Sequence, residues 1–188
     1  LRTAAFFGVA IRSIHSWCRQ KGHEAVSRME IIEIGAVMLA SAAGPVVSEF
    51  DSFVRPSCDS KLSDFCMELT SITQEQVDSA DPFPVVFDRF MEWAGAEPFV
   101  LCSWGLYDLQ QFEVELRQHR MRKPLSFNRH INLKRAFAEM RGIKPCGMKR
   151  ALEIAGIPIQ GTHHRGIDDA RNIARLAMSI LPGIEEKM

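Results

Sequence analysis

The hydrophobic and polar positions predict two neighbouring strands in the first third of the chain. Residues 30–39 form a short apolar run rich in Ile and Val, which is typical of a buried strand. Residues 46–54 alternate apolar and polar side chains, and the Ser, Gly and Pro of residues 40–45 predict a turn between the two runs. We therefore expect an antiparallel hairpin that ends at Arg55 and Pro56, because proline cannot donate to the ladder.

Later segments show the three- and four-residue spacing of amphipathic helices. The last of these has an apolar stripe from Ile167 to Leu181, and Pro182 and Gly183 are expected to end it. Strands that come first and helices that interleave later indicate an α/β or α+β fold with one mixed sheet. No internal repeat or linker interrupts the pattern, so we expect residues 1–188 to form a single domain. The pattern also predicts a short strand at residues 98–104 and helices at residues 83–93, 108–120, 131–140 and 148–155.

Composition narrows the class of protein. A chain of 188 residues that is 46% hydrophobic can bury a full core without disulfides. The 5 Cys are odd in number and form no CxxC pair, which argues against a disulfide framework or a zinc site and predicts a reducing, cytoplasmic location. No apolar run is long enough to span a membrane, and the N-terminal run lacks a small-residue cleavage site, so we expect neither a membrane protein nor a signal peptide.

Charge is unevenly distributed along a chain whose formal net charge is zero. Residues 116–150 contain eleven Lys or Arg and one acid, whereas residues 45–115 contain fourteen acids and three Lys or Arg. Such asymmetry can create a basic face that contacts phosphates, or it can be an ordinary set of solvated helix surfaces. The candidate nucleic-acid contacts in the basic segment are Lys134, Arg135, Lys149 and Arg150.

Two groups of residues could carry chemistry. Asp108 follows the strand at residues 98–104, at the kind of strand-to-helix junction where α/β proteins build sites. His163, His164, Asp168 and Asp169 lie where a glycine-containing loop enters the last helix. Carboxylates from the two places could converge on a hard cation such as Mg²⁺, with a histidine as general base. Alternatively, Asp168 or Asp169 only caps the helix, Asp108 only starts one, and His163 only holds the loop.

Several short segments, in order, resemble a known family. Residues 103–108 (SWGLYD) resemble the second exonuclease motif of the DEDD superfamily, and residues 164–170 (HRGIDDA) resemble the third motif of its histidine-containing branch. Further matches point to the subgroup of histone-mRNA and RNA-interference-regulating 3′ exonucleases and their bacterial relatives. These are MEIIEIGAVML at 29–39, FVRP at 53–56, LTSIT at 69–73, INLK at 131–134 and GTHHRGIDDARNIA at 161–174.

The resemblance implies a ribonuclease H-like fold, in which a five-stranded mixed sheet is flanked by helices. It implies 3′→5′ cleavage of single-stranded RNA or DNA from a free 3′ end, with release of 5′-mononucleotides. Two divalent cations, Mg²⁺ or Mn²⁺, would be held by four acidic side chains. Carried over by position, Asp108 and Asp169 are metal ligands and His164 is the general base.

The sequence departs from the family at its first motif, Asp-x-Glu on the first strand. Aligning the cysteine that follows this motif with Cys18 places Ser13 and His15 at the two acidic positions. Neither is an anionic ligand, and residues 12, 13 and 15 interrupt the apolar run, so residues 1–18 predict a poor strand. Three interpretations follow: an altered, out-of-frame N-terminal sequence, which we favour; a pseudoenzyme; or an enzyme with unusual ligands.

Two rival functions accompany these interpretations. The first is a catalytically inactive module that binds RNA 3′ ends, which the basic segment supports equally well. The second is a DNA-proofreading exonuclease of the same fold. The segments INLK and GIDDARNIA favour the RNA-trimming subgroup over the second.

Overall fold

A computed structural model describes residues 5–15, 29–42, 44–58, 60–97 and 99–185 of the chain. The strands are β1 (Ala5–His15), β2 (Met29–Leu39), β3 (Val46–Phe53), β4 (Phe99–Ser103) and β5 (His130–Asn132). The helices are α1 (Asp64–Thr70), α2 (Gln74–Asp78), α3 (Phe83–Ala94), α4 (Tyr107–Gln118), α5 (Leu133–Arg141), α6 (Met148–Ala155) and α7 (Gly166–Glu185), with a 3₁₀ turn η1 at Leu125–Asn128.

The five strands form one mixed sheet in the order β3-β2-β1-β4-β5. The pairs β2–β3 and β1–β2 are antiparallel, whereas β1–β4 and β4–β5 are parallel. The predicted hairpin of β2 and β3 is confirmed, and β4 lies in the same sheet as expected. The fold is therefore α/β, with the five-stranded mixed sheet flanked by helices that the resemblance implied.

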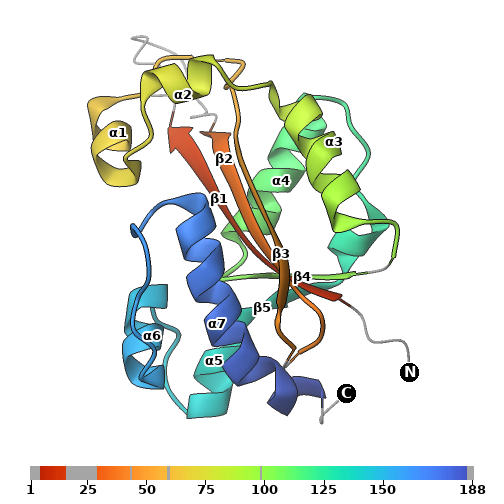
Figure 1. The fold of residues 1–188 in the computed structure, drawn as a ribbon, viewed down its shortest axis with the longest axis vertical. Coiled ribbons are helices and arrows are strands. Elements are labelled where there is room, and N and C mark those ends of the chain that lie inside the picture. Colours follow the sequence, from red (N-terminus) through yellow and green to blue (C-terminus); the bar gives the residue numbers. More distant parts are fainter. Residues whose placement is uncertain (1–4, 16–28, 43, 59, 98, 186–188) are drawn as a thin grey trace, which may run out of the picture.

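Helices cover both faces of the sheet (Figure 1). Successive residues of a strand point to opposite faces, so β4 gives Val100 and Cys102 to one core and Phe99 and Leu101 to the other. The first core packs under α5, α6 and α7, and the second, rich in Phe, packs under α3 and α4. Burial of β4 on both faces explains why its sequence is continuously apolar.

A β-bulge in β2 sits opposite the end of β1. Arg12 pairs with Glu33 and Ser13 pairs with Ile31, which leaves Ile32 as the extra residue on β2. The Ile32 carbonyl accepts a hydrogen bond from the Val54 N–H at 2.9 Å, so the bulged residue is tied to the segment after β3.

The structure corrects the expectation that residues 1–18 make a poor strand. Ala5–His15 forms β1 at the centre of the sheet: residues 5–8 pair with β4, residues 6–15 pair with β2, and the positions of Arg12, Ser13 and His15 belong to the ladder with β2. A ladder is formed by backbone N–H and C=O groups, which polar residues supply as well as apolar ones. Cys18, on which the alignment of the first motif rests, lies outside the described residues.

Two predicted helix ends were wrong. The helix expected from residue 131 begins at Leu133, because His130–Asn132 pairs with β4 as β5 and Asn132 caps α5 by accepting from the Arg135 N–H at 3.1 Å. The last helix continues through Pro182 to Glu185. A proline inside a helix removes a single N–H donor, and here the helix runs on past it. None of the helices in the described ranges is long and apolar enough to cross a membrane.

Candidate active site

Asp108 enters the site from the junction between β4 and α4, where the sequence placed it. It is the second residue of α4 and is 8% exposed. The turn before it is fixed by two hydrogen bonds: Ser103 Oγ donates to the Gly105 carbonyl at 3.1 Å, and Trp104 Nε1 donates to the Cys146 carbonyl at 3.0 Å. Gly105 has a φ of +123°, a conformation that side chains disfavour, so this turn depends on a glycine.

Asp168 and Asp169 are neighbours in the first turn of α7, but their carboxylates contact different groups. The Asp168 carboxylate accepts from the Thr162 N–H at 2.8 Å and pairs with Arg171 at 3.0 Å. A Cβ at Gly161 would lie 2.3 Å from this carboxylate group, so the loop passes directly over it. Asp168 therefore has a structural role, as the sequence left open, but it holds the loop before α7, since its carboxylate accepts from the Thr162 N–H of that loop.

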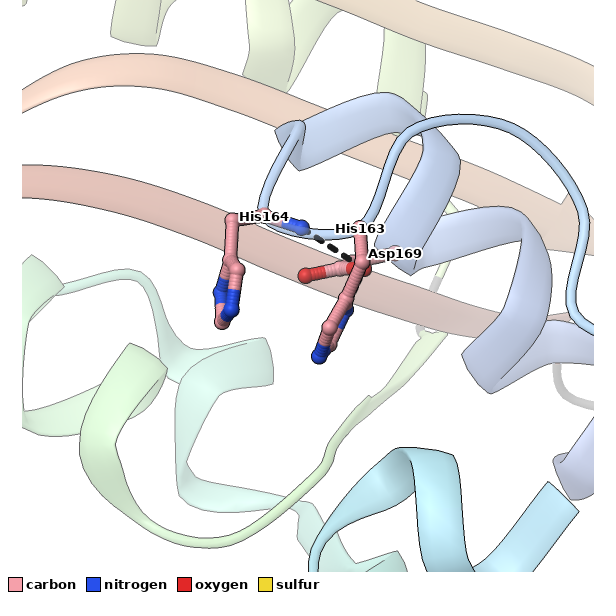
Figure 2. A group of neighbouring side chains, drawn as sticks. All are labelled: His163, His164 and Asp169. Atoms are coloured by element: carbon pink, nitrogen blue, oxygen red, sulfur yellow. Dashed lines mark hydrogen bonds and ion pairs between the residues drawn. The ribbon is translucent and has the colours of Figure 1, made fainter. Parts of the chain in front are cut away.

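Asp169 instead faces two histidines (Figure 2). Its side chain is almost buried, and Oδ1 lies 3.0 Å from His163 Nδ1 and accepts from the His164 N–H at 3.4 Å. The two imidazole rings stack with centroids 3.9 Å apart, and His164 has a φ of +76°. One ligand atom from each of these three residues lies within 4.8 Å of the other two. Asp108 is not part of this group of three.

The loop and the start of α7 are anchored to the sheet by a buried carboxylate on β2. Glu33 is fully buried, and its Oε2 accepts from the Gly166 N–H at 2.6 Å while its Oε1 pairs with Arg165 at 3.1 Å. A Cβ on Gly35, the next residue on this face of β2, would lie 2.2 Å from the backbone of Gly166 and Ile167. The helix end can approach β2 this closely because residue 35 is a glycine.

A second carboxylate lies against this anchor. Asp51 on β3 is hydrogen-bonded to Glu33, and burial, reinforced by repulsion from Glu33, raises the pKa of Asp51 to about 6. The positive charges of Arg165 and Arg171 oppose the shift. The loop that carries the two histidines is thus held by a network of two carboxyl groups and two guanidinium groups.

The first-motif positions lie at the same end of the sheet as Asp108. β1 and β4 run parallel, with Gly8 opposite Cys102, so the later part of β1 extends beyond the end of β4. Ser13 and His15 belong to this extension, opposite Ile31 and Met29 of β2. Carboxyl ends of parallel strands meet at one edge, which is where α/β proteins place ligands.

The residues of this chain do not fit the two-cation centre that the family resemblance implies. That centre needs four carboxylates, and hard cations such as Mg²⁺ prefer oxygen ligands. Asp108 and Asp169 are acidic, but the alignment by Cys18 places serine and histidine at the two remaining positions, and the carboxylate of Asp169 has two imidazoles beside it.

Sequence reasoning missed the roles of two residues. Glu33 received no part in the site, although an acid inside an apolar strand is a signal of a buried ion pair. His163 was named in the candidate group without a role of its own, with holding the loop as the alternative, and the adjacent pair of histidines was the available signal for more. The sequence contained no local sign that Glu33 would meet Arg165, because the two are 132 positions apart.

The four basic residues proposed to contact nucleic acid lie on α5 and α6, which both pack against α7. Arg135, Lys149 and Arg150 are exposed, and Lys134 is half-buried. Arg135 pairs with Glu139 at 2.7 Å and Arg150 with Glu153 at 3.0 Å, so their charges are partly balanced on the same helix. Their contact with nucleic acid stays a prediction.

A protein-family model and several characterised proteins are similar in sequence to this chain. The protein-family model RNase_T, described as Exonuclease, matches residues 22–177. The 3′-5′ exoribonuclease 1 of Mus musculus is 32% identical over 171 residues, which are 86% of this chain and 50% of that protein. The ERI1 exoribonuclease 2 of Danio rerio is 38% identical over 176 residues, 82% of this chain and 32% of that protein. The chain thus spans half or less of the length of these relatives.

A solved structure agrees closely in fold. The nuclease domain of 3′hExo, described as a DEDDh family member bound to rAMP, matches with a TM-score of 0.85 and 27% sequence identity. The match covers 96% of this chain and 93% of that chain. The site elements β4, α4 and α7 are therefore parts of a fold shared with a known nuclease.

Proposed function

The chain belongs to the exonuclease family of the RNase_T model, and from that premise we propose that it is a 3′→5′ exonuclease domain acting on single-stranded nucleic acid, with RNA favoured. The observation that carries the proposal is Asp169, nearly buried in the first turn of α7 beside two histidines. In this assignment Asp108 and Asp169 would hold a divalent cation, Mg²⁺ or Mn²⁺. His164 would accept the proton of the attacking water.

The names of the relatives favour RNA as the substrate, and one feature of the site favours a single strand. The relatives in Mus musculus and Danio rerio are both named exoribonucleases, and the solved nuclease domain is described with bound rAMP, a ribonucleotide. Beside Asp108, Leu106 is 49% exposed and Tyr107 is 41% exposed. An exposed aromatic ring next to a carboxylate suits an unpaired base, because every base can stack on a ring whatever its sequence.

One observation favours a second function. Ser13 and His15 occupy the two positions at which the family has anionic ligands, so the chain as written has lost half of that ligand set. A domain that keeps the fold and binds RNA 3′ ends without cutting them would show this substitution. The exonuclease and the binding module would both bind RNA 3′ ends, but only the exonuclease would cleave them.

Restoring the first motif tests the choice between them. The unmodified chain should be nearly inactive, since loss of one preorganised electrostatic partner costs about a hundred- to a thousand-fold in rate. The double variant Ser13→Asp, His15→Glu should release 5′-mononucleotides from a 3′-labelled single-stranded RNA when Mg²⁺ or Mn²⁺ is added. Adding Asp108→Ala to the double variant should abolish the cleavage, which separates this activity from that of a contaminating nuclease.

Two other results would change the conclusion in different ways: the first would support the exonuclease and correct only the first motif, and the second would refute the exonuclease. Robust cleavage by the unmodified chain, abolished by Asp108→Ala, would show that positions 13 and 15 are not the missing ligands. A folded double variant that binds the RNA and never cuts it would favour the binding module.

A further inference from the structure

We propose that His163, His164 and Asp169 form a binding site for one transition-metal ion of the Zn²⁺ or Co²⁺ class, which this chain binds more tightly than Mg²⁺. The inference goes beyond the proposed cleavage, which assigns His164 to proton transfer and gives His163 no role. It rests on the donor atoms gathered at the start of α7 and is testable without any nuclease activity.

Two of the donor atoms are already as close together as two ligands of one small ion. His163 Nδ1 and Asp169 Oδ1 are 3.0 Å apart, and one atom from each of the three residues lies within 4.8 Å of the others. Two ligands that each bind Zn²⁺ at about 2.0–2.2 Å lie about 3 Å apart when they subtend a right angle at the ion. Figure 2 shows the two imidazoles side by side, projecting from the loop in the same direction. An ion would replace the contact between His163 Nδ1 and Asp169 Oδ1, and the two stacked rings, whose planes differ by 26°, would turn toward it.

The donor types decide which ion is preferred. Two neutral imidazoles and one carboxylate are the protein ligands of many catalytic zinc sites, and imidazole suits Zn²⁺, Co²⁺ and Ni²⁺. Mg²⁺ instead needs oxygen ligands in nearly octahedral geometry and gains little from nitrogen. With serine and histidine at positions 13 and 15, the carboxylates that would offset this preference at the first motif are absent from the sequence.

The loop that carries the two histidines is held on both sides before any ion arrives. Glu33 fixes the backbone of Gly166 and the side chain of Arg165, and Asp168 fixes the loop at Thr162. The two histidines lie between these anchors, and Asp169 follows them on the first turn of α7. Residues that orient metal ligands from behind raise affinity, because less freedom is lost when the ion binds.

Titration with Co²⁺, followed by visible absorption, tests the site directly. The chain as written, freed of any polyhistidine tag, should bind one Co²⁺ per molecule. An equimolar amount of Zn²⁺ should displace it, and about a hundred-fold excess of Mg²⁺ should not. His163→Ala and His164→Ala should each weaken binding at least about ten-fold, and His163→Gln should do the same with a smaller change in shape. Thermal unfolding checks that each variant is folded.

A matched control comes from a histidine elsewhere in the fold. His119 lies at the C-terminal end of α4, where it stacks on Phe83, and His119→Ala should leave Co²⁺ binding unchanged. Binding that survives both His163 variants, or that is lost equally in His119→Ala, would overturn the proposal. So would displacement of Co²⁺ by an equimolar amount of Mg²⁺.

The outcome is separate from that of the cleavage assay, because binding is measured without substrate. A restored Ser13→Asp, His15→Glu chain that never cleaves RNA, tested beside an unmodified chain with a histidine-dependent Co²⁺ site, refutes the proposed function alone. Cleavage by the restored chain, together with no histidine-dependent site in the unmodified chain, refutes the metal proposal alone.

Discussion

Single carboxylates in this protein take their roles from the group that each one faces. Asp168 and Asp169 are adjacent in sequence, but the first caps a loop and the second faces two imidazoles, since consecutive residues of a helix point about 100° apart. Glu33 and Glu49 both pair with an arginine, yet Glu33 is fully buried whereas Glu49 lies at the surface against Arg171. The two ion pairs are therefore expected to contribute differently to the free energy of unfolding.

We predict that Glu33→Gln lowers the free energy of unfolding by about 2–4 kcal/mol, because it leaves the partly buried Arg165 without its counter-charge. Glu49→Gln is the matched control, and it should cost about 0–1 kcal/mol, since its ion pair with Arg171 is solvated. Urea denaturation of the three proteins at neutral pH measures both values. Equal losses in the two variants would show that Glu33 is not the anchor of α7.

At the scale of elements, much of the fold was readable from the sequence. Periodicity predicted α6 at its observed bounds and the β2–β3 hairpin with its turn, because each depends on residues close together in the chain. The strand β5 was read as the start of a helix, since three residues carry no usable period and their pairing with β4 is long-range. The short helices α1 and α2 were also missed, and their caps at Ser63 and Thr73 were the available signal.

Part of the candidate site could be predicted from the sequence and part could not. Asp108 and Asp169 were predicted at element junctions, and both lie there. The anchor of α7 could not be predicted, because Glu33, Gly35 and Gly166 meet only when the sheet and the last helix are packed.

The contact between α7 and β2 should be intolerant of a single methyl group. Gly35→Ala would place a Cβ 2.2 Å from the backbone of Gly166, so the helix must move, and we expect a loss of at least about 2 kcal/mol in stability. Gly147→Ala provides the control: this glycine has an ordinary φ of −63° and open space around its missing Cβ. Thermal unfolding should separate the two variants by several degrees. A neutral Gly35→Ala would mean that α7 sits further from β2.

The contact between α4 and β2 should make stability depend on pH. Glu115 accepts from the Ile31 N–H at 2.7 Å, and burial raises the pKa of Glu115 to about 7 from its usual 4.5. The folded protein therefore keeps this proton at pH values where the unfolded chain has lost it. The contribution of Glu115 to the free energy of unfolding is greatest below about pH 4.5. It falls by about 1–3 kcal/mol as the pH rises to about 7, and it is constant above that pH.

Glu115→Gln should remove this decline, since an amide still accepts from Ile31 and does not titrate. Glu113→Gln, on the same helix and paired with Lys123 at the surface, is the control and should leave it in place. Free energies of unfolding measured from pH 4 to 8 give the slopes. Parallel slopes for all three proteins would show that Glu115 is ionised throughout.

At the scale of the whole molecule, the sheet separates two cores of different composition. The Phe-rich core under α3 and α4 lies on one face, and the core under α5, α6 and α7 lies on the other (Figure 1). The site elements come from both sides, since α4 supplies Asp108 and α7 supplies Asp169. The basic helices α5 and α6 share the side of α7, so the proposed phosphate contacts would approach from there.

Salt dependence tests that proposal. Lys134→Ala with Lys149→Ala should weaken binding of a single-stranded RNA and reduce the slope of log K against log salt by about 1.4, or about 0.7 for each lost phosphate contact. Arg89→Ala, on α3 and paired with Asp81, should leave the slope unchanged. Fluorescence anisotropy at several salt concentrations gives these slopes. An unchanged slope in the double variant would assign α5 and α6 to an ordinary solvated surface.

The central position of β1 has a consequence for how such a protein is screened. Residues 13 and 15 are joined to β2 through backbone groups, which any residue type supplies, so Ser13 and His15 occupy the ladder as an aspartate and a glutamate would. We expect similar yield, solubility and melting temperature for the chain with Ser13 and His15 and for the chain with Asp and Glu at these positions. A screen for well-folded protein would therefore not detect the loss of the first motif. Only an assay of function would distinguish the two sequences at positions 13 and 15.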